Sequence, residues 1–280
     1  MKRVLTAVIL IPVVLVLVFL PPFLQWLFTA ATAVAAALAA WECLGLAQDR
    51  PAYRPRIVVA VATLILFVAW WEWQDADSFL PVYGILCLAL LLICTFASPT
   101  ERMLRDATSS IFCLFYTGLT LIALPALREQ ANGPSLVLFL LLVVWAGDTA
   151  AYYVGRTWGR HKLAPRISPN KSWEGSIASV AGSVLITVGL LELAEALTTR
   201  LNSAVLSYSP DPWWYWLALA VLVNVAAQVG DLAESALKRS AGVKDSGSLL
   251  PGHGGVLDRI DALLVAAPVL WYAQVIRHSF

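Results

Sequence analysis

The chain has 280 residues, of which 60% are hydrophobic and 13% are charged, and its mean hydropathy is +0.76. This composition excludes an ordinary soluble domain and predicts an all-α integral membrane protein. The net charge of +1 gives no reason to expect a nucleic-acid partner. The cysteines lie singly within apolar runs, so we expect buried thiols rather than disulfides or a metal cluster. They are Cys43, Cys87, Cys94 and Cys113.

Successive apolar runs of about 20 residues, the length that crosses a bilayer, predict a polytopic bundle of about nine transmembrane helices. They lie at 4–20, 24–46, 57–73, 79–97, 109–127, 135–155, 174–196, 212–232 and 256–276. The first run has the layout of a signal peptide, but a second run follows at once, so we expect a retained span. We expect one membrane domain over residues 1–280.

The distribution of lysine and arginine predicts which ends of these helices face the cytoplasm. With a cytoplasmic N-terminus, 15 of the 19 cations lie on inner segments, and Arg259 lies at the inner end of a helix. Only Arg128, Arg200 and Arg277 lie outside. The positive-inside rule therefore favours an inner N-terminus and an outer C-terminus.

The first four spans carry little chemistry. Glu42 lies beside Trp41 in the second run, and we expect it to pair with a cytoplasmic arginine. The alanine-rich segment 30–40 offers small residues for close helix packing, either within a subunit or in a homodimer.

Polar residues inside the later spans are costly in lipid and usually face a bundle interior. For Asp148, in the sixth run, we expect a functional role near the cytoplasmic side. Asn224 and Gln228 lie on one helical stripe that leads to Asp231. For these two residues, interhelical hydrogen bonding and a functional role remain equal alternatives.

Two long polar segments fall on the cytoplasmic side of this topology. Segment 155–173 contains five cations, including Lys171, which either fix the topology or contact a substrate. Segment 231–261 contains five carboxylates, four cations and His253 within 31 residues. The alternative for this second segment is an ordinary loop with topogenic cations, but that alternative gives no reason for acidic residues at both flanking helix ends.

The spacing of residues in segment 231–261 predicts a site for a cation and a polyphosphate. Asp231, Ser235 and Lys238 share one helical face, as do Asp258 and Asp261. Two facing acidic helix ends provide the oxygen ligands that Mg²⁺ prefers. Between them, Gly252, His253, Gly254 and Gly255 precede a helix start and predict a phosphate cradle. Lys238, Arg239 and Lys244 add counter-charge for phosphates.

The same residues carry a resemblance to a known family. The runs Ser235-Ala236-Leu237-Lys238-Arg239, Lys244-Asp245, His253-Gly254-Gly255 and Asp258-Arg259-Ile260-Asp261 resemble the signature of the phosphatidate cytidylyltransferases, or CDP-diacylglycerol synthases. A second element, Ser168-Pro169-Asn170-Lys171-Ser172-Trp173-Glu174-Gly175, is similar to another part of that family. Asn170 departs from the pattern, because many relatives have a lysine there.

The resemblance implies transfer of CMP from CTP to phosphatidic acid, giving CDP-diacylglycerol and pyrophosphate, at the inner face of a bacterial cytoplasmic membrane. We expect the catalytic elements within 145–261. We expect Mg²⁺ and a second cation such as K⁺, with Asp231, Asp258, Asp261 and Asp148 as ligands. We expect Lys238, Arg239, Lys244, His253, Gly254 and Gly255 to contact CTP, and Ser235, Lys171 and Arg259 to contact the lipid phosphate.

Two alternatives from other classes stay open at this point. A CTP-dependent polyprenol kinase would also need Mg²⁺ and a nucleotide loop. A transporter could use buried acids for ion coupling, although the paired broken helices typical of transporter repeats are not evident in the sequence. For Asp245, an ion pair that orients Lys244 or Arg239 is an alternative to a direct role.

Overall fold

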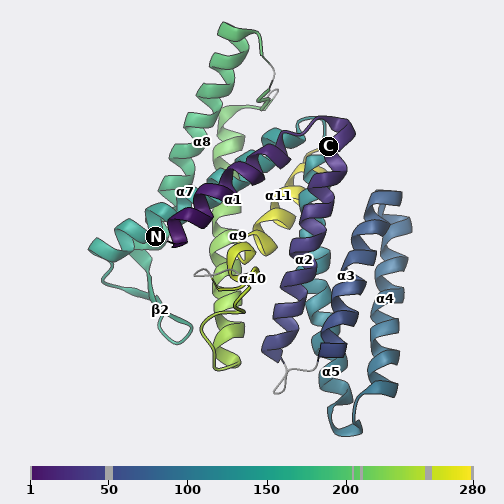
Figure 1. Ribbon diagram of the computed structural model, residues 1–280. Helices are drawn as coiled ribbons and strands as arrows, with labels where there is room; N and C mark the ends of the chain where they lie inside the picture. Colours follow the sequence, from purple (N-terminus) through teal and green to yellow (C-terminus); the bar gives the residue numbers. More distant parts are fainter. Residues whose placement is uncertain (1, 48–52, 204, 209–210, 250–253, 279–280) are drawn as a thin grey trace. The chain divides into compact units, whose positions relative to one another are not determined.

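The computed structural model describes residues 2–47, 53–203, 205–208, 211–249 and 254–278. The chain forms two compact units, each built almost entirely from helices (Figure 1). Unit 1 comprises Met1–Ala126 and Ser240–Ile260, and unit 2 comprises Leu127–Arg239 and Asp261–Phe280.

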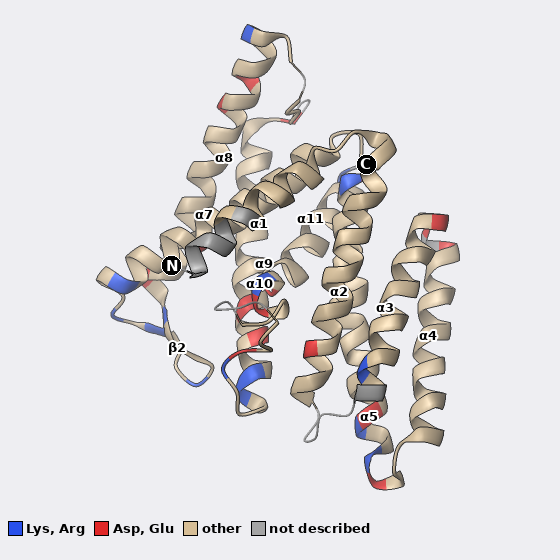
Figure 2. Ribbon diagram, viewed as in Figure 1, with Lys and Arg blue, Asp and Glu red and all other residues tan. Residues whose placement is uncertain are grey.

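Unit 1 contains helices that pack in the order of the sequence. Helix α2 packs against α3, α3 against α4, and α4 against α5. In α3 and α4, the described charged side chains, those of Arg56, Glu72 and Asp77, lie near the helix ends (Figure 2). The elements are α1 (Lys2–Val18), η1 (Pro22–Leu24), α2 (Gln25–Ala47), α3 (Tyr53–Trp73), α4 (Ala76–Ala97), α5 (Thr100–Cys113), the π-helical η2 (Leu114–Leu119), most of α6 (Ala123–Arg128) and α10 (Leu257–Ile260).

The alanine-rich face of α2 forms much of the core of unit 1. Ala36, Ala39 and Ala40 are fully buried, and Ala33 and Ala37 are nearly so. Small side chains allow helix backbones to approach closely, which favours packing where lipid gives no hydrophobic driving force. These five alanines are therefore used within the subunit.

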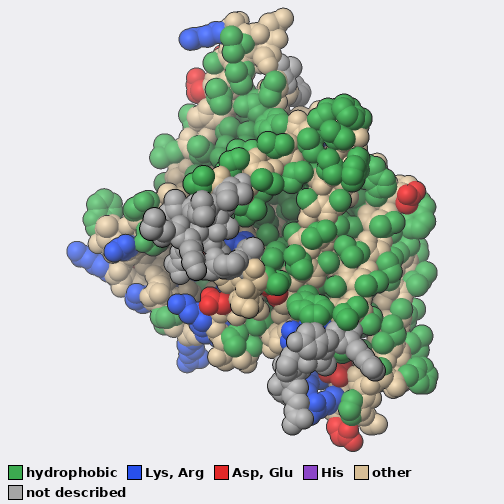
Figure 3. All heavy atoms as spheres, viewed as in Figure 1, with side chains coloured by type: hydrophobic (Ala, Val, Ile, Leu, Met, Phe, Trp, Pro, Cys, Tyr) green, Lys and Arg blue, Asp and Glu red, His purple; other side chains and the backbone are tan. Residues whose placement is uncertain are grey.

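Large apolar side chains cover the outer face of α4. Ile85, Leu88, Leu92 and Phe96 are all exposed, and their spacing of three and four residues places them on one side of the helix. Figure 3 shows hydrophobic side chains spread widely over this part of unit 1. Such a face is expected of a helix that contacts lipid.

Unit 2 is organised around the close antiparallel packing of two long helices, α7 (Gly133–Trp158) and α8 (Trp173–Leu201). A Cβ atom on Gly182 would lie 2.7 Å from the Cβ of Ala150 and 3.0 Å from the carbonyl oxygen of Ala146, so the backbones meet closely there. Between them lies an antiparallel hairpin of β1 (Lys162–Ala164) and β2 (Ser168–Ser172). The unit also contains α9 (Trp213–Ser240), most of which lies within it, and α11 (Leu263–His278).

The prediction of an all-α polytopic membrane protein is confirmed. In the described part of the chain, eight helices are long and apolar enough to cross a membrane, from Pro22–Ala47 to Leu257–Arg277. The first expected span, 4–20, coincides with α1, which has 17 residues. The ninth span and the cytoplasmic N-terminus stay predictions.

The last expected span is not a continuous helix. Helix α10 ends at Ile260, and α11 begins at Leu263. In the intervening turn, the Asp261 carboxylate accepts a hydrogen bond from the backbone N–H of Ala262, at 2.8 Å. Asp258 lies in α10, whereas Asp261 lies in this turn, so the two residues do not share one helix as the spacing had predicted.

Candidate active site

The β1–β2 hairpin carries Lys171 and is held to the start of α8 by two sets of hydrogen bonds. The Ser172 hydroxyl accepts a hydrogen bond from the Gly175 N–H, at 3.2 Å, which caps the helix N-terminus. The Glu174 carboxylate accepts the backbone N–H of His161, at 3.2 Å, and contacts its ring Nδ1, at 2.7 Å. His161 remains exposed, and its contact with Glu174 closes the hairpin.

Lys171 forms an ion pair with Asp231 of α9. The Ser235 hydroxyl lies 3.5 Å from the other carboxylate oxygen of Asp231, so these two residues share the helical face that their spacing predicted. The side chains of Lys171 and Asp231 are 26% and 35% exposed, so both remain accessible to a ligand.

Two further carboxylates of unit 2, those of Asp148 and Asp261, lie close enough to Asp231 to interact with it electrostatically. Asp148 comes from α7, and Asp261 from the turn before α11. Gly230 of α9 allows that turn to approach, because a Cβ atom there would lie 2.7 Å from the carbonyl oxygen of Asp261. The structure therefore brings together three of the four predicted metal ligands within unit 2.

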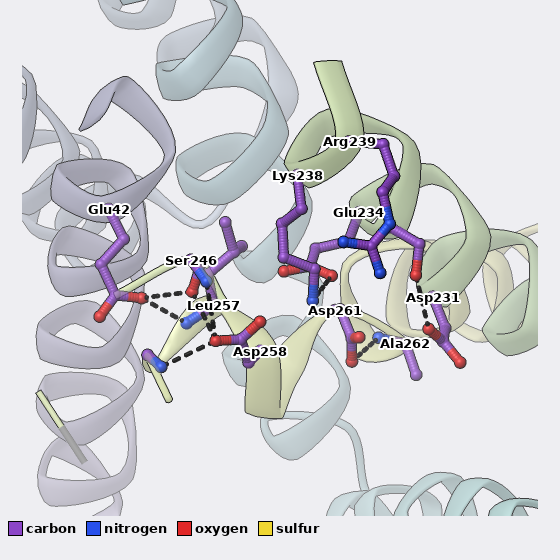
Figure 4. A network of polar contacts seen from close by, with 12 residues as sticks. Glu42, Asp231, Glu234, Lys238, Arg239, Ser246, Leu257, Asp258, Asp261 and Ala262 are labelled. Atoms are coloured by element: carbon purple, nitrogen blue, oxygen red, sulfur yellow. Dashed lines mark hydrogen bonds and ion pairs between the residues drawn. The ribbon is translucent and has the colours of Figure 1, made fainter. Parts of the chain in front are cut away.

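The last turns of α9 carry two of the predicted phosphate-binding cations. Lys238 pairs with the fully buried carboxylate of Glu234, at 2.5 Å, one helical turn earlier (Figure 4). The Arg239 guanidinium donates a hydrogen bond to the carbonyl oxygen of Ile167, at 3.4 Å, and so links α9 to the hairpin. Glu234 was not predicted as a functional residue.

In unit 1, Asp258 organises the segment that precedes α10. One of its oxygens accepts hydrogen bonds from the Ser246 N–H at 2.9 Å and from the Gly255 N–H at 2.8 Å, and it lies 3.0 Å from the Ser246 hydroxyl. Gly254 has a φ of 79°, which favours glycine, and a Cβ atom there would lie 2.5 Å from the same carboxylate oxygen. The Gly255 N–H, part of the predicted phosphate cradle, thus donates to a carboxylate of the chain itself.

Glu42 of α2 is a second carboxylate of unit 1 that contacts this segment, and it is buried, only 4% exposed. It accepts the backbone N–H groups of Val256 at 3.0 Å and Leu257 at 2.8 Å, and it lies 3.1 Å from the Ser246 hydroxyl (Figure 4). These contacts differ from the arginine pair expected from the sequence. The only signal in the sequence was a carboxylate within an apolar run, because its partners are more than 200 residues away.

The remaining predicted site residues are less fixed by contacts. Lys244, Asp245 and Arg259 are exposed. His253 lies outside the described residues. Asp258 belongs to unit 1, whereas Asp231 belongs to unit 2, so their convergence on one cation stays a prediction.

Asn224 and Gln228 have a structural use in unit 2. Asn224 donates hydrogen bonds to the hydroxyls of Ser179 and Ser183 of α8, at 2.9 and 2.8 Å. Gln228 donates to the Asn224 side-chain oxygen, at 2.7 Å, and accepts a hydrogen bond from Ser176, at 2.5 Å. Of the two alternatives, interhelical hydrogen bonding is the one that the contacts support.

The acidic residues fit a hard cation by their donor chemistry, since carboxylate oxygens are the ligands that Mg²⁺ prefers. Within the described ranges, no group of three or more His, Cys, Asp or Glu side chains is arranged to hold a metal ion alone. Protein sites commonly bind Mg²⁺ through one or two carboxylates, completed by water and substrate phosphates. The residues of this chain suit that shared arrangement better than a closed protein cage.

The fold and these clusters define a polytopic helical membrane protein with acidic and basic side chains gathered near helix ends. A family model described as "Cytidylyltransferase family" matches residues 1–276. The chain therefore belongs to the cytidylyltransferase family.

Curated proteins named phosphatidate cytidylyltransferase are similar to this chain. One from Haemophilus influenzae is 32% identical, with 97% of each chain covered, and one from Staphylococcus saprophyticus is 34% identical, with 77% of each covered. One from Brucella melitensis is 47% identical over 56% of this chain. The chain spans about half of the length of that relative, 54%.

Proposed function

We propose that the protein is a phosphatidate cytidylyltransferase, which transfers CMP from CTP to phosphatidic acid and gives CDP-diacylglycerol and pyrophosphate. Family membership supports the reaction class, and the relatives that match along most of their length carry this name. The observation that carries the proposal is the accessible pair of Lys171 and Asp231, with Asp148 and Asp261 nearby.

The reaction needs no strong general base, because the lipid phosphate is already an anionic nucleophile. One of its oxygens forms a bond to the α-phosphorus of CTP, and the bond between that phosphorus and the oxygen bridging to the β-phosphate breaks. Pyrophosphate leaves with the electron pair of the broken bond. The barrier lies in bringing two anions together and in the charge of the leaving group, so positioning and electrostatics supply the catalysis.

The cations of the chain have two proposed tasks. Lys171, Ser235 and Arg259 hold the lipid phosphate, and the Lys171 ammonium exchanges its carboxylate partner for that phosphate. Lys238, Arg239 and Lys244, with the segment His253-Gly254-Gly255, hold the phosphates of CTP. Guanidinium and ammonium groups bind phosphates through charge-assisted hydrogen bonds.

The carboxylates Asp231, Asp258, Asp261 and Asp148 are the proposed holders of Mg²⁺, together with a second cation such as K⁺. Bound there, Mg²⁺ would neutralise charge on the phosphates of CTP. We propose that the enzyme lies in the cytoplasmic membrane of a bacterium with this site facing the cytoplasm, and that it can form a homodimer.

The decisive experiment uses purified protein, phosphatidic acid and CTP labelled at either its α- or its γ-phosphate. We expect α-label in the lipid product and γ-label in pyrophosphate, and we expect a chelator to abolish transfer and added Mg²⁺ to restore it. Transfer of γ-label to a lipid acceptor would instead identify a kinase. Full activity in chelator would remove the metal from the proposal.

A further inference from the structure

We propose that Glu42 is a positioning residue that fixes the loop between α9 and α10, which carries proposed contacts of the CTP phosphates. This inference rests on the proposed function. The residue lies in the second apolar span, 204 residues before the nearest of the loop residues that it contacts. Its carboxylate contacts the loop on both sides of the segment 250–253: Ser246 on one side, and Val256 and Leu257 on the other. It therefore acts as a clasp that holds the two ends of this loop together.

The group that makes these contacts, the Glu42 carboxylate, is buried. Burying a carboxylate in an apolar helix is costly unless hydrogen bonds compensate it, and an aliphatic side chain would fill the same space without that cost. Glu42 is 4% exposed, and both of its oxygens are used: one accepts the Val256 N–H, and the other faces the Leu257 N–H and the Ser246 hydroxyl. The hydrogen bonds that compensate the burial of Glu42 thus come from Ser246, Val256 and Leu257.

The same carboxylate leaves no room for a side chain at two glycines of the loop. A Cβ atom on Gly247 would lie 2.5 Å from one oxygen of Glu42, and a Cβ atom on Gly255 would collide with the other oxygen and with the Ser246 hydroxyl. Real Cβ atoms do not approach oxygens so closely, so any larger residue would displace Glu42 or the loop. The buried carboxylate explains glycine at both positions, although only Gly255 belongs to the phosphate cradle predicted from the sequence.

Ser246 connects Glu42 to Asp258, one of the proposed metal ligands. Its hydroxyl oxygen lies 3.1 Å from a Glu42 oxygen and 3.0 Å from an Asp258 oxygen, but a hydroxyl has a single proton to donate. A change at Glu42 therefore reaches Asp258 through one shared hydrogen-bond donor. The same loop carries Lys244, a proposed contact of the CTP phosphates, which explains why an effect on CTP is expected.

The first test compares Glu42→Ala with Thr32→Val. Thr32 is a matched control, because it is buried in the same helix and its hydroxyl donates to a carbonyl oxygen of that helix, that of Phe28, at 2.9 Å. Glu42→Ala is expected to speed hydrogen exchange of the Val256 and Leu257 amides and to lower kcat/KM for CTP by roughly 10- to 100-fold, the effect typical of residues that orient a ligand. The KM for phosphatidic acid should not change, and Thr32→Val should alter none of these quantities.

Unchanged exchange of these amides in Glu42→Ala, or an unchanged kcat/KM for CTP, would overturn the inference. The exchange measurement does not depend on which reaction the protein catalyses. If the unmodified protein transfers no CMP to phosphatidic acid, the proposed function fails, while faster exchange in Glu42→Ala would still support the clasp.

A second variant keeps the inference testable if Glu42→Ala does not fold. Gly247→Ala, with Glu42 intact, is expected to reduce kcat/KM for CTP, because the new methyl group and the carboxylate compete for one space. Where Glu42→Ala does fold, the same change in that background should have little further effect, since the carboxylate is gone. Strictly additive losses, or a fully active Gly247→Ala protein, would contradict the clasp.

Discussion

At the scale of single residues, the pair of Lys171 and Asp231 is easier to explain by function than by stability. Both side chains are about one-quarter to one-third exposed, and partly solvated ion pairs stabilise proteins only weakly. In contrast, Asp211 is 7% exposed in its ion pair with Arg277, which also lies over the ring of Tyr215. The second pair has the burial and the neighbours of a structural contact.

This contrast gives a prediction with a matched control. Asp231→Asn should lower CMP transfer by roughly 100-fold, as expected for the loss of a ligand-orienting carboxylate, and should cost less than about 1 kcal/mol of unfolding free energy. Asp211→Asn should cost about 1–3 kcal/mol, because it weakens a buried charged hydrogen bond, and should leave transfer intact. Turnover and denaturation midpoints in detergent check both variants, and an active Asp231→Asn protein would remove Asp231 from the site.

At the scale of helices, unit 2 depends on very close contact between α7, α8 and α9. Asn224 of α9 reaches two hydroxyls of α8, and Ser183 of α8 donates to the Val143 carbonyl oxygen of α7, at 2.7 Å. Gly147 of α7 faces this cluster, and a Cβ atom there would lie 2.8 Å from the Ser179 hydroxyl. Interhelical polar contacts and small residues are the usual means of joining helices in lipid.

Gly147→Ala is therefore expected to destabilise the protein by about 1–3 kcal/mol through overpacking. Gly189→Ala is the matched control, because this glycine lies within α8 and a Cβ atom there would meet no atom within 4 Å. Alanine is the better helix former, so the control should be neutral or stabilising by up to about 1 kcal/mol. Thermal unfolding in detergent separates the two, and equal stabilities would contradict the packing described.

At the scale of the whole molecule, the sides of the membrane on which the two termini lie depend on whether α1 crosses it. Its 17 residues correspond to about 25 Å of helix, slightly less than the hydrocarbon thickness of a typical bilayer. With eight further spans, a crossing α1 places the two termini on opposite sides.

We predict that a C-terminal alkaline phosphatase fusion, which is active only after export, will be active in bacterial cells. A fusion that ends after Ser240 should be inactive, because that segment is expected in the cytoplasm together with the N-terminus. An inactive C-terminal fusion together with an active fusion after Ser240, with both proteins inserted in the membrane, would contradict this topology.

The sequence predicts local structure here better than long-range contacts. Apolar runs of membrane length identify the helices, because a bilayer imposes that length on each span. The spacing of Asp231 and Ser235 places them on one helical face, which the structure confirms. The contact between Glu42 and Leu257 depends on how distant helices pack, and no spacing rule contains that information.

The turn at Asp261 and the hairpin contact of His161 were also missed, for a related reason. The break between α10 and α11 falls inside a run whose hydropathy is high enough for a continuous span. The contact of His161 with Glu174 joins residues 13 positions apart across a hairpin, a distance that helical periodicity does not register. Both features are properties of the backbone path rather than of composition.

The interruption before α11 has a consequence for how a lipid substrate would arrive. Helix α11 alone has 16 residues, about 24 Å, which is shorter than the hydrocarbon layer of a typical bilayer. Under the proposed function, we expect the polar turn at its start to lie at the inner edge of that layer, near the phospholipid headgroups. A phosphomonoester attached to diacylglycerol already resides at that depth. Under the proposed function, encounter then requires only two-dimensional diffusion in the inner leaflet, and no lipid has to be lifted out of the bilayer before its phosphate reacts.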